Sequence, residues 1–130
     1  MNILVVEDEP VVAELIKRLL EELGNQCLVA PDAEHADRAL DQARIDAVTL
    51  DLGMPGTGGL SWLERVAARR PELARRTVVI TGMELDPATV ERVTRCGAGV
   101  LAKPFSLREL AAAVRQSLDG PLTENLDPTA

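Results

Sequence analysis

Short apolar runs alternate with longer amphipathic segments along the chain. The five runs are residues 3–6, 27–30, 47–50, 77–80 and 99–102. Apolar residues fill each run almost without interruption, which is typical of strands buried on both faces. After each run, apolar residues recur at spacings of three and four, which predicts a helix. Five strands alternating with five helices predict a doubly wound α/β fold around a parallel sheet.

The composition favours a single globular domain. Of the 130 residues, 46% are hydrophobic and 27% are charged, which excludes a disordered chain. The longest apolar runs have four or five residues, so we expect no membrane span. The first residues lack the basic flank and cleavage site of a secretory signal, and we expect a cytoplasmic protein. Cys27 and Cys96 lack C-x-x-C spacing and are expected to be reduced, mostly buried thiols.

The end of the chain differs from the rest. Residues 120–130 contain two prolines and no periodicity. They are expected to form a tail or linker after a domain that spans residues 1–119.

The net charge of the chain indicates which class of partner it is unsuited to bind. The formal net charge is −7, which argues against direct binding of nucleic acid, because neutralising phosphates requires a concentrated basic face. The densest basic group is Arg65, Arg69, Arg70, Arg75 and Arg76. These arginines follow a predicted helix into its loop, and we interpret them as a solvated edge.

Polar side chains directly follow four of the five predicted strands. They are Glu7 and Asp8, then Asp51, Thr81 and Lys103. The carboxyl ends of parallel strands meet at one edge of a sheet, where ligands bind. Three carboxylates there repel one another unless a cation lies among them, and an all-oxygen site suits Mg²⁺. A metal and a lysine together can hold an oxyanion, as phosphoryl transfer requires. Asp51 is the expected nucleophile, because carboxylates can form acyl phosphates.

Each of these residues also has an ordinary structural explanation. Asp8 or Asp51 alone would be a helix cap, Thr81 a turn residue and Lys103 a surface charge. Their joint occurrence at one edge of one sheet is hard to explain by capping and favours the functional interpretation.

The pattern resembles the receiver domain of bacterial two-component response regulators over about residues 1–119. The matching motifs are Glu7-Asp8, Asp51 followed by Met54-Pro55 and Gly59, then Thr81, and Lys103-Pro104-Phe105. The resemblance implies a flavodoxin-like sheet of strand order 2-1-3-4-5, and it allows a cis Lys103–Pro104 bond. It also implies transfer of phosphate from a partner's phosphohistidine to Asp51, which would switch a protein-interaction surface.

The same resemblance implies a role for each site residue. Asp8 and Asp51 would bind Mg²⁺ directly, Glu7 through a water and Gly53 through its backbone carbonyl. Lys103 would pair with the phosphoryl oxygens, and Thr81 would move in to hydrogen-bond them. The partner would be a sensor histidine kinase or a histidine phosphotransfer protein, and activation could produce a homodimer. The chain would be a signalling receiver that catalyses its own phosphorylation and dephosphorylation, not an enzyme acting on other substrates.

Three positions depart from the family pattern. Val100 stands where a tyrosine or phenylalanine commonly turns inward on activation, and it is too short to report a shift of Thr81 by changing rotamer. Gly53 and Met83 flank the expected phosphoryl group without a polar atom to orient water. We therefore expect slow decay of the aspartyl phosphate and an unusual output switch.

Two other functions are compatible with parts of the pattern. A small phosphatase with an aspartyl nucleophile would typically carry a second aspartate two residues later, where this chain has Gly53. A pure interaction module would keep the fold without the chemistry. The complete set of five site residues argues against such a module, whereas Val100, in place of the usual aromatic residue, is compatible with one.

Overall fold

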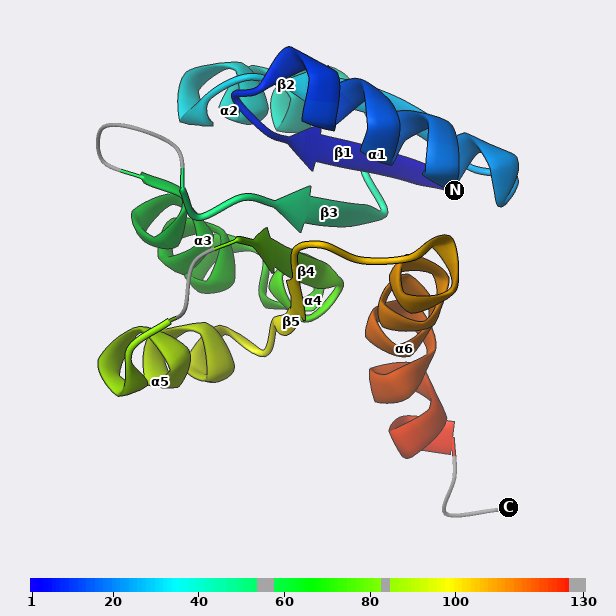
Figure 1. The fold of residues 1–130 in the computed structure, drawn as a ribbon. Coiled ribbons are helices and arrows are strands. Elements are labelled where there is room, and N and C mark those ends of the chain that lie inside the picture. The colour runs from blue at the N-terminus through cyan, green and yellow to red at the C-terminus, as the bar shows by residue number, and fades with distance from the viewer. Residues whose placement is uncertain (54–57, 83–84, 127–130) are drawn as a thin grey trace.

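The sheet has the predicted parallel topology. In a computed structural model, residues 1–53, 58–82 and 85–126 are described, with 118–126 as backbone only. The strands are β1 (Asn2–Val6), β2 (Gln26–Ala30), β3 (Ala47–Leu50), β4 (Thr77–Thr81) and β5 (Gly99–Ala102). All neighbouring pairs are parallel, in the order β2-β1-β3-β4-β5 (Figure 1). The doubly wound, flavodoxin-like fold is therefore confirmed.

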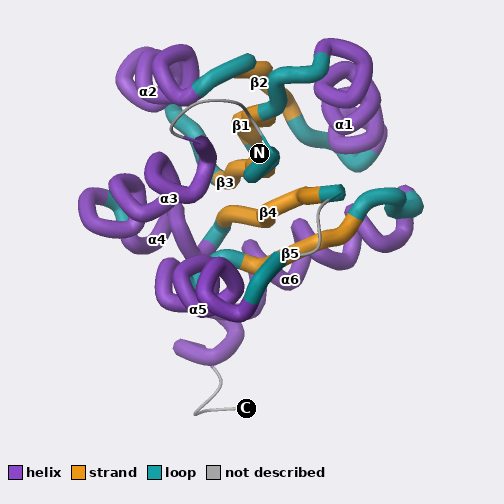
Figure 2. The backbone as a smooth tube through the Cα atoms, turned by 60° about the vertical axis from the view of Figure 1, so that its left-hand side comes forward, coloured by secondary structure: helices purple, strands orange, loops and turns teal. Residues whose placement is uncertain are grey.

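Helices cover both faces of this sheet (Figure 2). They are α1 (Pro10–Glu22), α2 (Ala33–Gln42), α3 (Gly58–Arg69), α4 (Pro71–Arg75), α5 (Pro87–Cys96) and α6 (Leu107–Leu126). Alternate strand residues enter two cores: Leu4 packs with residues of α2, α3, α4 and α5, whereas Ile3 packs with residues of α1 and α6. Burial of each such side chain contributes about 1.5–3 kcal/mol, so the central strands are fixed from both sides.

Helix ends follow local chemistry in the sequence. The Asp32 carboxylate accepts a hydrogen bond from the His35 amide at the start of α2 (2.8 Å). Before α6, Ser106 and Glu109 exchange reciprocal side-chain to backbone hydrogen bonds, which is the capping box. Helix α5 ends at Gly97, whose φ of +83° is in the left-handed region that glycine adopts at low cost.

The prediction of five helices was short by one. The missed helix is α4, which occupies the segment interpreted as a loop. Leu73 and Ala74 of this helix are buried, and the Thr77 hydroxyl donates to the Leu73 carbonyl (2.9 Å). Five residues are too few to show a helical period, so tertiary packing decides its structure.

Helix α6 continues to Leu126. Residues 120–126, the first part of the expected tail or linker, are therefore helical. Division of the chain into a domain of residues 1–119 and a tail of 120–130 stays a prediction.

Other expectations concern single residues. Trp62 of α3 is fully buried, and Phe105 packs partly buried against the core on the α1 and α6 face. Cys96 is buried and Cys27 is half-buried, both as free thiols. The Lys103–Pro104 bond is cis. Within the described ranges, we find no helix with the length and apolarity needed to span a membrane.

Candidate functional site

The ends of four strands bring the predicted polar residues to one edge of the sheet. Glu7 and Asp8 follow β1, and the Asp51 amide donates to the Val6 carbonyl (3.0 Å), which extends the β1–β3 ladder by one bond. The Lys103 amide donates to the Thr81 carbonyl (2.9 Å) and extends the β4–β5 ladder in the same way. Central strands that end in register therefore fix the backbone of the site.

Three carboxylates converge at this edge. Glu7, Asp8 and Asp51 each offer one oxygen atom, and these atoms all lie within 4.8 Å of one another. The Glu7 side chain is 1% exposed and that of Asp51 is 9% exposed, while Asp8 reaches further into solvent. Such an all-oxygen group, open on one side, suits a hard divalent cation that keeps part of its water shell.

Lys103 lies between the two buried carboxylates. Its Nζ atom is 3.2 Å from Glu7 Oε1 and 3.8 Å from Asp51 Oδ2. The lysine side chain is 27% exposed, and an added methyl group at Gly82 would lie 3.8 Å from its aliphatic part. The ammonium therefore offsets part of the negative charge while it remains reachable from solvent.

Backbone amides orient both buried carboxylates. The Gly53 amide donates to Asp51 Oδ1 (2.8 Å), and the Glu9 amide donates to Glu7 Oε2 (3.3 Å). Burial raises the pKa of Glu7 to about 7, assisted by the hydrogen bond and the negative charge of Asp51, while Lys103 and the Glu9 amide act in the opposite direction. Ionising Glu7 at this edge therefore costs free energy unless a further positive charge, such as a bound cation, lies beside it.

A glycine lets helix α3 approach the site. A Cβ atom at Gly59 would lie 2.9 Å from the Asp51 carbonyl oxygen and 2.9 Å from Leu50 Cδ1. Real Cβ atoms do not come so close to a backbone oxygen. Gly59 therefore allows the first turn of α3 to pack directly against the end of β3.

The remaining predicted residues differ in where they lie. Thr81 is buried at the end of β4, opposite Ala102 of β5. Val100 lies on the edge strand β5 with 49% of its surface exposed, three residues before Lys103. Met54, Pro55 and Met83 lie outside the described residues.

Two contributions to the site were not expected from the sequence. One is the Glu9 amide that binds Glu7, and the other is Gly82 beside the Lys103 side chain. Gly82 directly follows Thr81, so its position after a strand could have indicated a role at this edge. A backbone amide has no signal in the sequence.

Comparison with known proteins gives a consistent result. The family model described as the response regulator receiver domain matches residues 3–115. The transcriptional regulatory protein TcrA of Mycobacterium tuberculosis is 36% identical over 126 residues, which cover 94% of this chain and 48% of TcrA. The positive alginate biosynthesis regulatory protein of Pseudomonas aeruginosa is 34% identical over 120 residues, covering 90% of this chain and 47% of that protein. The chain thus spans about half the length of these two relatives.

Solved structures lead to the same family. The receiver domain of NtrX from Brucella abortus superimposes with a TM-score of 0.81 at 30% identity, covering 90% of this chain and 98% of that one. The matched family model covers most of the chain, and its range includes all five strands apart from Asn2, the first residue of β1. The chain therefore belongs to the response regulator receiver domain family, whose members act in two-component signalling.

Proposed function

We propose that Asp51 is the phosphoacceptor of this receiver domain. The observation that carries the proposal is the position of the Lys103 ammonium, within 3.8 Å of both Asp51 and Glu7 at an edge that also holds Asp8. A carboxylate beside a fixed cation and a possible metal site has the partners that phosphoryl transfer needs.

Mg²⁺ is the cofactor that we propose for this edge. Asp8 and Asp51 would bind the ion directly, Glu7 through a water and Gly53 through its carbonyl. The fit is supported by three carboxylate oxygens within 4.8 Å of one another, with the ammonium of Lys103 as the charged partner of two of these groups. When bound, the ion would neutralise phosphoryl oxygens during transfer.

The proposed reaction uses the residues of this chain in distinct roles. An Asp51 carboxylate oxygen attacks the phosphorus of a phosphohistidine on the partner, the new O–P bond forms as the N–P bond breaks, and the imidazole of the partner leaves with the electron pair. Lys103 holds the phosphoryl oxygens, and the Thr81 hydroxyl donates a hydrogen bond to the product. Hydrolysis of the aspartyl phosphate then returns Asp51 to its free form, so the domain catalyses both steps on itself.

The proposed donor is a sensor histidine kinase or a histidine phosphotransfer protein. Helix α1 begins two residues after Asp8 and carries Val11 with 82% of its surface exposed and Leu15 also exposed. Apolar side chains beside the site would let a donor protein dock with its histidine near Asp51. Homodimerisation on activation, a cytoplasmic location and absence of direct nucleic-acid binding stay predictions.

A phosphorylation assay tests this function. The protein is incubated with acetyl phosphate and Mg²⁺, and the phosphorylated fraction is measured by phosphate-affinity gel and intact mass. We expect one phosphoryl group on the wild type, none on Asp51→Asn and none when EDTA replaces Mg²⁺. Phosphorylation of Asp51→Asn to the wild-type level would refute the assignment. Gel filtration with and without beryllofluoride, which mimics a phosphoryl group, then tests dimerisation.

A further inference from the structure

A cavity between α2 and α3 has no role in the proposed phosphotransfer. Its volume is about 400 Å³ and it opens to solvent, a size typical of small-molecule sites. It is lined by Asp37, Leu40, Asp41, Arg65, Val66, Arg69 and Arg70. Helix α3 begins at the phosphorylation site and spans about 18 Å, and the cavity lies along its second half. The cavity is thus separate from the carboxylate cluster.

The floor of the cavity is apolar. Val66 is buried, and Leu40 packs partly buried against the same core. Both belong to helices held against the sheet, so this floor is part of the rigid domain. A carbon skeleton placed there would lose contact with water.

Asp37, in one wall of the cavity, is hydrogen-bonded to the only tryptophan of the chain. The Trp62 indole N–H donates to Asp37 Oδ1 (2.8 Å), and Arg65 Nη2 lies 3.5 Å from Asp37 Oδ2. Trp62 is itself fully buried. Asp37 is therefore held from two sides, and any ligand that moves Arg65 alters the environment of the indole.

Among the described residues, the other charged groups of the cavity have no charged partner. Within the described part of the chain, Arg69 and Asp41 form no ion pair or side-chain hydrogen bond, and the guanidinium of Arg70 reaches only the Leu40 carbonyl, at 3.4 Å. The dipole of α3 favours a cation at its C-terminal end, which accounts for Arg69 alone. Three arginines against two aspartates make the cavity locally cationic on a chain of net charge −7.

We propose that this cavity binds a small phosphorylated metabolite of the size of a mononucleotide or a sugar phosphate. Arg69 and Arg70 both line the cavity, and arginine binds the oxygens of a phosphate monoester through two parallel hydrogen bonds. Asp41 accepts a hydrogen bond from a hydroxyl or amino group of the ligand, and the carbon skeleton covers Leu40 and Val66. These arginines thus form part of a binding site and not only a solvated edge.

NMR titration of the intact chain tests the proposal, because its single indole N–H gives one isolated ¹⁵N–¹H signal. The small probes are AMP, ribose 5-phosphate, inorganic phosphate and uncharged ribose, and a short DNA duplex and an acidic peptide are titrated beside them. We expect a saturable shift of the Trp62 indole signal with AMP or ribose 5-phosphate, and which of the two binds more tightly distinguishes a nucleotide from a sugar phosphate. Ribose alone should give no shift.

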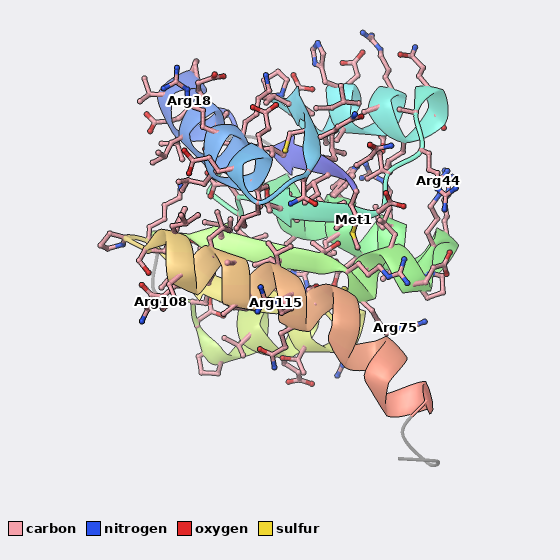
Figure 3. All side chains as sticks on the ribbon, turned by 90° about the vertical axis from the view of Figure 1, so that its right-hand side faces the viewer. Met1, Arg18, Arg44, Arg75, Arg108 and Arg115 are labelled. Atoms are coloured by element: carbon pink, nitrogen blue, oxygen red, sulfur yellow. The ribbon has the colours of Figure 1, made fainter. Side chains whose placement is uncertain are left out.

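Matched variants locate the site. Arg69→Ala combined with Arg70→Ala should weaken the apparent affinity by about tenfold or more, as expected for lost charge-assisted hydrogen bonds. The control combines Arg108→Ala with Arg115→Ala on α6 (Figure 3), which removes two exposed arginines that also lack an ion pair in the described part of the chain, and it should bind like the wild type. Asp51→Asn should also bind normally, so failure of the phosphoacceptor proposal would not imply failure of this one.

Three outcomes would overturn the inference. The first is a shift that does not saturate with any phosphorylated probe. The second is equal weakening in the α6 control, which would indicate a general charge effect. The third is tighter binding of duplex DNA or an acidic peptide than of either phosphorylated probe, which would make the arginines a macromolecular surface.

Discussion

Substitution of Glu7 by glutamine should make the metal-free domain more stable at slightly alkaline pH. In the folded state, the pKa of Glu7 is raised to about 7, first by burial and then by Asp51, whereas the unfolded value is near 4.5. The folded state therefore holds this proton more tightly than the unfolded chain does. As the pH rises from 4.5 through 7, the unfolded chain releases the proton first and the free energy of unfolding falls.

The size of the effect follows from the difference in pKa. Each pKa unit corresponds to about 1.4 kcal/mol, so a rise from 4.5 to about 7 corresponds to a loss of about 3 kcal/mol once Glu7 is fully ionised. The solvent screens this charge little, because the side chain is almost completely buried. Glutamine keeps the shape of the protonated carboxyl and cannot ionise, so the variant should lack this loss.

Other titrating groups do not obscure the comparison. Backbone hydrogen bonds from His35 and Thr89 lower the pKa values of Asp32 and Asp86, respectively. Stability due to these two groups is present above their unfolded pKa of 3.8 and is lost only as the pH falls below it. Both carboxylates are ionised above pH 4.5 in the wild type and in the Glu7 variant alike.

Urea denaturation in EDTA, followed by the fluorescence of Trp62, measures the free energy of unfolding at steps from pH 4.5 to 8. We expect the wild type to lose about 3 kcal/mol more than Glu7→Gln over this range, and added Mg²⁺ to restore more stability to the wild type at pH 8 than to the variant. The reasoning would be refuted if the free energy of unfolding had the same pH dependence in the wild type and in Glu7→Gln, or if the variant were less stable than the wild type at pH 8. The second result would mean that the Lys103–Glu7 pair contributes more than the burial of Glu7 costs.

Three further substitutions test the packing and chemistry near the site. Gly59→Ala should push α3 away from Asp51. We expect urea denaturation to show a loss of about 1–3 kcal/mol in stability and phosphorylation by acetyl phosphate to be slower. Wild-type stability and rate would contradict the close contact between α3 and the end of β3. Thr49→Val should raise stability by about 1 kcal/mol in urea denaturation, because Thr49 Oγ1 is buried without a hydrogen-bond partner among the described residues, and a loss would contradict this. Gly53→Asn should speed decay of the aspartyl phosphate after donor removal by offering a polar group to water, and an unchanged decay rate would remove the idea.

The fold was predictable because the central strands β1, β3 and β4 are buried on both faces. Such strands appear in the sequence as continuous apolar runs, and the predicted bounds of β3 and β5 agree with the structure. Polar residues just past these runs then had to lie at one edge, so convergence of Glu7, Asp8 and Asp51 could be predicted without coordinates. Topology, and not sequence proximity, brings Lys103 to them.

Other features depend on tertiary contacts that leave no periodic signal. Helix α4 is too short for a pattern and exists because Leu73 and Ala74 are buried. The hydrogen bond between Trp62 and Asp37 joins residues 25 positions apart on two helices. The arginines after residue 64 could be counted in the sequence, but the cavity beside Arg69 depends on how α2 packs against α3.

Glu7 and Asp8 are neighbouring carboxylates with different environments. Both follow the last residue of β1, but Glu7 is buried against Lys103 while Asp8 reaches further into solvent. One lysine among three carboxylates leaves the cluster negative, and burial, the main cause, acts with the negative charge of Asp51 to raise the pKa of Glu7. A divalent cation would correct the imbalance and favour the ionised form of Glu7, so its binding releases a proton near neutral pH. We therefore expect cation affinity to increase with pH between about 6 and 8, with Asp8 as the most accessible point of entry.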